Sequence, residues 1–80
     1  MIEVRIPKIG MSTIEVEVAQ VLVTVGERVE PNSVIISAEA DKVDFDIEAG
    51  ASGIVNAIFV AKGDVVAVGA VVALINDDEN

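Results

Sequence analysis

The stretch "VLVTVGERVEPNSVIISA" (residues 21–38) decides the fold, because it recurs 37 residues later as "IFVAKGDVVAVGAVVALI" (58–75). The matched pairs are Val23 and Val60, Gly26 and Gly63, Val29 and Val66, and Val34 and Val71. Each copy begins with a strand pattern, followed by a turn in which glycine precedes an acidic residue. A short apolar segment, a second turn and another strand pattern complete the copy. Neither copy could bury its apolar face alone, so we expect the two to close on each other with pseudo-two-fold symmetry.

Strand patterns also fill the rest of the chain. The predicted strands are "IEVRI" (2–6), "TIEVEVAQVLV" (13–23), "SVIISAE" (33–39), "VDFDIE" (43–48), "GIVNAIFVA" (53–61) and "AVVALI" (70–75). In the second of them Ile14, Val16 and Val18 alternate with polar residues and predict one apolar face. No window keeps a helical apolar period over three turns. We therefore predict an all-β domain, a flattened barrel of two small antiparallel sheets (a barrel-sandwich hybrid).

Composition narrows the functions that the chain can serve. A formal net charge of −9, with the few basic residues scattered, argues against a nucleic-acid partner, which requires a basic patch. The lack of cysteine and histidine removes disulfides, thiolate metal sites and the commonest general base. No apolar run reaches the roughly 20 residues that span a bilayer, and "MIEVRIPKIG" (1–10) has no apolar region of a signal peptide. We expect no nucleic acid, metal or membrane partner, and a monomeric isolated domain.

One basic residue stands among acidic neighbours. Only Ala40, Asp41 and Lys42 separate two predicted strands, so these strands are expected to form a tight hairpin with Asp41 and Lys42 at its centre. An exposed amine beside Glu39 and Asp44 has no cause for a lowered pKa and would be a poor nucleophile. Another enzyme can nevertheless acylate it, and a rigid tip would then present a tethered cofactor. The alternative interpretation is an ordinary solvated turn.

The strand after the hairpin carries alternating carboxylates, at Asp44, Asp46 and Glu48. Side chains two residues apart in a strand share a face, so the three are predicted to lie together opposite Val43, Phe45 and Ile47. They lack the glycine and the long acidic loop of a calcium-binding hand. We expect a solvated face whose field attracts basic partner surfaces.

The segment "EADKVDFDIEAGASGIV" (39–55) resembles the lipoyl domain of the acyltransferase component of 2-oxo acid dehydrogenase complexes. Supporting similarities are "IPKIGMS" (6–12), "VGERVEPNSVI" (25–35), "ASGIV" (51–55) and "KGDVVAVGAVVALI" (62–75), so the resemblance covers nearly the whole chain. It implies that residues 1–80 form one carrier domain, expected at the N-terminus of a longer multidomain chain. It also implies that Lys42 carries lipoic acid in amide linkage and that the domain has no active site of its own.

The resemblance further implies partners and recognition residues. The partners would be a thiamine-dependent decarboxylase, the acyltransferase core, dihydrolipoyl dehydrogenase, and the lipoate ligase or lipoyl transferase that modifies the lysine. The residues expected to be recognised are Glu39, Ala40, Asp41 and Val43 beside the lysine, and Lys8, Ile9, Gly10 and Met11 in the first loop. Ala40 stands where the family usually has threonine, which bears on the particular complex served.

Two other functions stay open from the sequence. Biotin carriers share the fold, but they usually place methionine on both sides of the lysine, whereas Asp41 and Val43 stand here. The lipoylated carrier of the glycine-cleavage system is longer and more helical than this chain allows, so the sequence fits that carrier less well. An unmodified adaptor of the same fold would tolerate replacement of Lys42. For a lipoyl domain, the expected location is the bacterial cytoplasm, or the mitochondrial matrix in a eukaryote.

Overall fold

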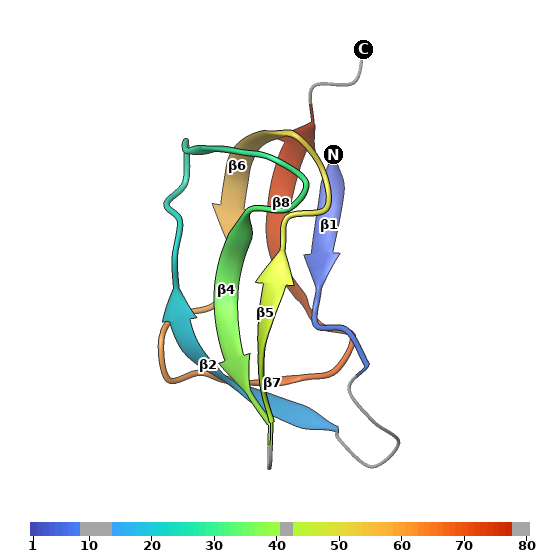
Figure 1. Cartoon of the computed structure of the whole chain (residues 1–80), viewed down its shortest axis with the longest axis vertical. Helices are drawn as coiled ribbons and strands as arrows, with labels where there is room; N and C mark the ends of the chain where they lie inside the picture. The colour runs from blue at the N-terminus through green and yellow to red at the C-terminus, as the bar shows by residue number, and fades with distance from the viewer. Residues whose placement is uncertain (9–13, 41–42, 78–80) are drawn as a thin grey trace.

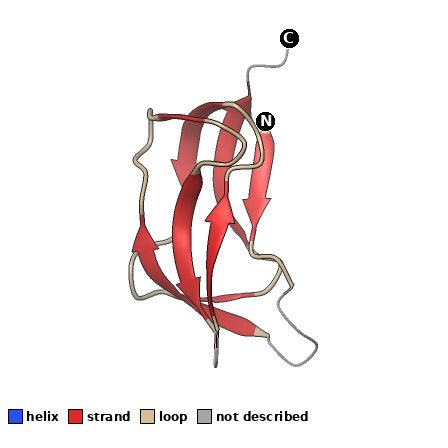
Figure 2. Ribbon diagram, viewed as in Figure 1, coloured by secondary structure: helices blue, strands red, loops and turns tan. Residues whose placement is uncertain are grey.

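The computed structural model describes residues 1–8, 14–40 and 43–77, and within them every regular element is a strand (Figure 2). The strands are β1 (Ile2–Arg5), β2 (Glu15–Val21), β3 (Arg28–Val29), β4 (Val34–Glu39), β5 (Asp44–Glu48), β6 (Gly53–Ile58), β7 (Val65–Ala67) and β8 (Val71–Asp77). They form two antiparallel sheets: the first sheet has the order β1-β8-β6-β3, and the second sheet has the order β5-β4-β2-β7 (Figure 1). The predicted all-β, two-sheet fold is confirmed.

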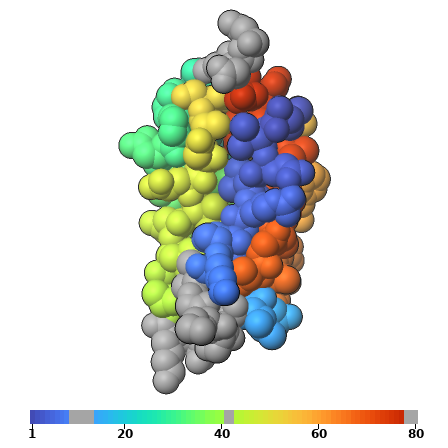
Figure 3. Space-filling model, turned by 90° about the vertical axis from the view of Figure 1, so that its right-hand side faces the viewer, coloured from blue at the N-terminus to red at the C-terminus, as the bar shows by residue number. Residues whose placement is uncertain are grey.

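The core lies between the two sheets and is entirely aliphatic in the described part of the chain. Alternation puts one face of each strand inward, so in β2 the residues Val16 and Val18 are buried while Glu15 and Glu17 are exposed. The largest fully buried side chains are Ile6, Ile35, Ile36, Ile75, Val18, Val55 and Val72. The space-filling view shows the edge strands β1 and β5 side by side along the long axis, where their side chains close the sandwich (Figure 3).

The internal repeat reappears as matched backbone hydrogen bonds. The Gly26 N–H donates to the Val55 carbonyl at 2.8 Å, and the Gly63 N–H donates to the Val18 carbonyl at 2.7 Å. Gly63 and Val55 are the repeat equivalents of Gly26 and Val18, so each half uses its glycine turn to hold a strand of the other half. Both glycines have positive φ, 96° and 93°, as their turns require. The predicted pseudo-two-fold closure is therefore confirmed.

The strand ends differ slightly from the sequence prediction. The strand predicted over 13–23 is β2, Glu15–Val21, because the chain leaves the second sheet after Leu22 and crosses to the first. The short apolar pair predicted in each half forms a short strand, β3 or β7, at a sheet edge. Four of the ladders among the longer strands also contain a register shift, which alternation alone does not reveal.

The molecule is elongated, with extents of 38 × 22 × 17 Å, and its two ends differ. Strands β4 and β5 join at one end, which we call the hairpin end; β1 begins and β8 ends at the opposite end (Figure 1). There the Met1 ammonium lies 3.7 Å from Asp77 Oδ1. No helix long and apolar enough to cross a membrane occurs in the described residues.

Candidate functional site

The hairpin between β4 and β5 is tight. The two strands pair in register up to their last residues, Glu39 opposite Asp44, and the Ala40 N–H then donates to the Val43 carbonyl at 2.8 Å. Only two residues of sequence separate Ala40 from Val43, which is the shortest of the common hairpin connections. Because β4 and β5 are paired up to Glu39 and Asp44, the two points at which this connection leaves the sheet are fixed. The hairpin is thus a rigid base at one end of the molecule.

The two central residues of this hairpin, Asp41 and Lys42, lie outside the described residues. Of the described residues beside them, Glu39, Val43 and Asp44 are exposed and Ala40 is half-buried against the core. The described part of the hairpin therefore presents exposed side chains at this end of the molecule.

Carboxylates surround the base of the hairpin. Glu39 lies opposite Asp44 on one side and opposite Glu17 on the other, so three acidic residues form a row across β2, β4 and β5. All three are exposed, and none has an ion pair within the part of the chain that the structure describes. Like charges in neighbouring strand positions repel. The row therefore gives this surface a negative potential that a basic partner surface would relieve.

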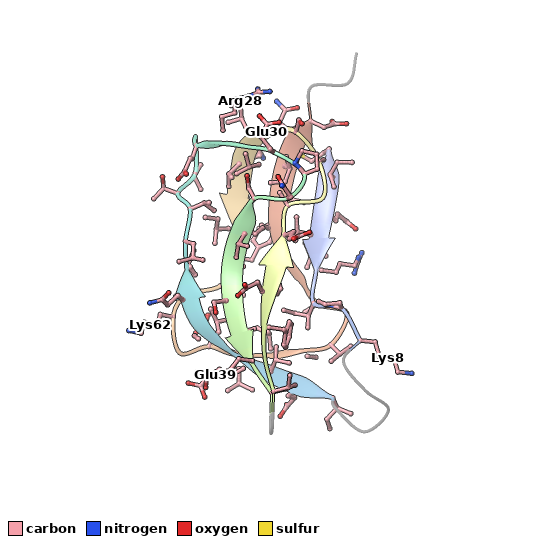
Figure 4. The ribbon with its side chains drawn as sticks, in the orientation of Figure 1. Lys8, Arg28, Glu30, Glu39 and Lys62 are labelled. Carbon is pink, nitrogen blue, oxygen red and sulfur yellow. The ribbon has the colours of Figure 1, made fainter. Side chains whose placement is uncertain are left out.

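Of the first-loop residues predicted to be recognised, the structure describes only Lys8; Ile9, Gly10 and Met11 lie outside the described residues. Lys8 is exposed, follows the end of β1, and lies in the same part of the molecule as Glu39, far from Arg28 and Glu30 (Figure 4). The chain therefore brings Lys8 to the same end as Glu39, although the two are distant in sequence. That this end is a recognition surface stays a prediction.

The predicted solvated face of β5 is confirmed. Asp44, Asp46 and Glu48 are exposed, while Phe45 is half-buried and Ile47 is buried between the sheets. Among the described residues, no group of three or more histidine, cysteine, aspartate or glutamate side chains is arranged to hold a metal ion.

Ile14 is a residue of this end whose exposure the sequence pattern did not predict. Its spacing put it on the apolar face with Val16 and Val18, yet 74% of its surface is exposed, against 2% and 0% for those two residues. Its backbone is nevertheless held, since the Val68 N–H donates to its carbonyl at 3.0 Å. The inward-facing side of β2 extends beyond the end of the core at this point. Alternation predicts the face of a residue but not the end of the core.

Comparison with known proteins gives consistent findings. A family model described as "Biotin-requiring enzyme" (Biotin_lipoyl) matches residues 2–75. The chain is 35% identical over 74 residues to the dihydrolipoyllysine-residue acetyltransferase component of the Corynebacterium glutamicum pyruvate dehydrogenase complex, covering 92% of the chain and 11% of that protein. It is 31% identical over 77 residues to the succinyltransferase component of the Bacillus subtilis 2-oxoglutarate dehydrogenase complex, covering 96% of the chain and 18% of that protein. The chain thus spans less than a fifth of these relatives.

A solved structure agrees with the sequence comparison. The lipoyl domain of the Azotobacter vinelandii 2-oxoglutarate dehydrogenase complex superposes with a TM-score of 0.79 at 27% identity, over 96% of this chain and 98% of that domain. The likeness therefore extends over the whole fold rather than over one sheet.

Proposed function

The chain belongs to the biotin- and lipoyl-attachment family, as a lipoyl domain of the acyltransferase type, and from this premise we propose that Lys42 carries a lipoyl group in amide linkage. The observation that carries the proposal is the tight hairpin: Lys42 belongs to a two-residue connection closed by the Ala40–Val43 hydrogen bond at an accessible end of the molecule. A lysine so placed can be reached by a modifying enzyme and then by each enzyme that uses the cofactor.

When attached, the lipoyl group supplies a dithiolane that can accept an acyl group together with two electrons. The residues of this chain hold the lipoyl group in position. The paired ends of β4 and β5 hold the attachment point away from the body of the domain, and the exposed carboxylates of Glu17, Glu39 and Asp44 attract basic partner surfaces. No residue of this chain is assigned a chemical step, and we propose that the domain is a carrier without catalytic activity of its own.

The proposed partners are the enzymes that load, use and regenerate the arm: a thiamine-dependent decarboxylase, an acyltransferase core, dihydrolipoyl dehydrogenase, and a lipoate ligase or lipoyl transferase. The relatives named above include both acetyltransferase and succinyltransferase components, and both types support an acyl-carrier role. We propose a place in the cytoplasm of a bacterium, or in the mitochondrial matrix of a eukaryote. Glu39, Ala40, Asp41 and Val43, with residues 8–11, are the proposed recognition surface.

A biotin carrier is the second candidate, because the matching family is described by biotin-requiring enzymes. The relatives named by sequence and by structure are lipoyl proteins, and the residues beside Lys42 are Asp41 and Val43 rather than methionine. These observations favour lipoate. An unmodified adaptor would leave the accessible hairpin without a use.

Mass spectrometry tests the proposal directly. The domain is incubated with lipoate, ATP and a lipoate ligase, and intact and peptide masses are recorded for the wild type, Lys42→Arg and Lys62→Arg. Lys62 is the matched control, because it is an exposed lysine in another tight turn, the one closed by the hydrogen bond from the Asp64 N–H to the Ala61 carbonyl at 3.0 Å. We expect one lipoyl group on the wild type and on Lys62→Arg, and none on Lys42→Arg. Biotin instead of lipoate after expression in a host that makes both would establish the biotin carrier, and no addition at all would leave only the fold in common.

A further inference from the structure

The hairpin end carries an apolar surface that the fold itself does not require. Here the inward-facing side of the second sheet extends past the first sheet: β2, β7 and the β4–β5 tip form the lower end of the molecule in Figure 1, beyond the ends of β1, β6 and β8. The exposed fraction of the inward-facing side chains rises toward this end on two of the strands. It rises from 2% at Val16 in β2 to 74% at Ile14, just before β2, and from 4% at Ile47 in β5 to 46% at Val43, just before β5.

Ile14 and Val43 therefore occupy positions that alternate with core residues and yet lie open to water. Ala40 and Phe45, also on the inward-facing side, are half-buried and pack against the core. We call Ile14, Ala40, Val43 and Phe45 the apolar shelf. Exposed apolar residues also occur elsewhere on this chain, for example Met1 and Val25, and the shelf differs from them in adjoining the hairpin.

The other half of the repeat shows that the fold does not require the apolar shelf. Moving 37 residues along the chain takes Ile14 to Ala51 and Ala40 to Asp77. At the opposite end these equivalents are a small half-buried residue and a carboxylate 3.7 Å from the Met1 ammonium. The position of Ile14 is thus large and aliphatic in one half and small in the other, and the position of Ala40 is apolar in one half and charged in the other. The difference coincides with the hairpin that contains Lys42.

We infer that the apolar shelf is a resting surface for the aliphatic part of the arm carried by Lys42, an inference that rests on the proposed function. The lysine side chain and an eight-carbon acyl group together make a chain of about a dozen bonds, which spans roughly 15 Å. Ile14 directly precedes β2, the strand beside β4, and the Glu17–Glu39 pairing directs this end of β2 toward the hairpin, so an arm of that length suits the separation. Tethering makes the contact intramolecular, and therefore even a small apolar surface competes with solvent for the arm.

The chemistry of the surroundings selects this occupant. Glu15, Glu39 and Asp44, the sequence neighbours of the shelf residues, are exposed carboxylates that point to the opposite face of the sheet, so the inward-facing side is the uncharged one. An uncharged alkyl arm gains nothing from these carboxylates, whereas it gains by covering aliphatic surface. The arm would thus alternate between a docked state on the domain and a free state that enters a partner enzyme.

Methyl NMR with a chemical probe tests the inference. Spectra of the chain before and after lipoylation are compared for the wild type, Ile14→Ser and Val25→Ser; Val25 is the control because it is 61% exposed in the turn that holds Val55. Ile14 is the informative reporter, since Val43 adjoins the modified residue in sequence. We expect lipoylation to shift the Ile14 methyl signals and to leave those of Val25 unchanged. After reduction, a bulky maleimide should alkylate the arm about threefold faster in Ile14→Ser than in Val25→Ser, because the docked fraction depends on apolar area.

Each other outcome is decisive. Unshifted Ile14 methyls, or equal alkylation rates in Ile14→Ser and Val25→Ser, would overturn the inference while a mass spectrum showing lipoate on Lys42 leaves the proposed function intact. An Ile14→Ser domain with unchanged alkylation but slower reductive acylation by a decarboxylase would assign the shelf to that enzyme instead of the arm. A chain that takes up no lipoate would overturn the proposed function, and the resting surface with it.

Discussion

Gly53→Ala is the substitution for which the structure sets the clearest magnitude. Gly53 is the first residue of β6 and pairs with both Val29 of β3 and Asp77 of β8. A Cβ at this position would overlap the Asn76 carbonyl oxygen and lie 2.8 Å from Asp77 Cα, closer than side-chain atoms approach backbone. Because the obstructing atoms are backbone, no side-chain rotation relieves the overlap. The ladder between β6 and β8 would have to separate at this end of the first sheet.

Overpacking of this kind costs typically about 1–3 kcal/mol, and we expect about 3 kcal/mol because backbone must move. A domain of this size is stabilised by roughly 4–12 kcal/mol in total. The melting temperature should therefore fall by about 12–24 °C. Since the chain has neither tryptophan nor tyrosine, unfolding in urea and by heat is best followed by far-ultraviolet circular dichroism.

Gly50→Ala is the matched control. Gly50 has a φ of +77°, but a Cβ there would meet no atom within 4 Å, so the change costs only backbone strain, about 1–2 kcal/mol. We expect Gly53→Ala to be the more destabilising of the two. A Gly53→Ala domain as stable as Gly50→Ala would refute the steric argument and show that the two strands can separate at little cost.

Four further substitutions test other parts of the description. Glu27→Ala and Asp64→Ala each remove a carboxylate that accepts a hydrogen bond from the backbone N–H three residues earlier, at 3.1 and 2.8 Å, in equivalent turns of the two halves. The two substitutions should therefore lower the free energy of unfolding by similar amounts, about 1 kcal/mol each. A large difference between them would contradict the equivalence of the halves. Glu39→Gln removes the middle carboxylate of the acidic row and should raise that free energy by about 0.3 kcal/mol at low salt, with the gain lost in 1 M NaCl; a gain independent of salt would exclude charge repulsion as its cause. Ile75→Ala empties a fully buried position and should cost about 3 kcal/mol in urea unfolding, whereas a cost below about 1 kcal/mol would mean that the core closes around the gap.

The sequence predicts the fold well because two independent patterns agree. Alternation defines the strands, and the repeat of Gly26 in Gly63 defines how the halves close on each other. The features that the sequence does not predict depend on distances between strands that are remote from each other in the chain. The overlap that makes Gly53 obligatory arises only when β6 lies against β8, and the exposure of Ile14 arises only because the first sheet ends earlier than the second. The position of Lys42 in a tight hairpin, in contrast, follows from the short gap between two strand patterns.

The reciprocal hydrogen bonds of Gly26 and Gly63 bear on how the two halves are related. In each half the N–H of the turn glycine donates to the equivalent valine carbonyl of the other half. Two separate copies of a chain of about half this length would therefore have the groups to associate in the same way. The chain thus has the form of two copies of one unit that differ at equivalent places. The first half has Lys42 between β4 and β5, and at the corresponding place the second half brings the end of β8 beside the beginning of β1.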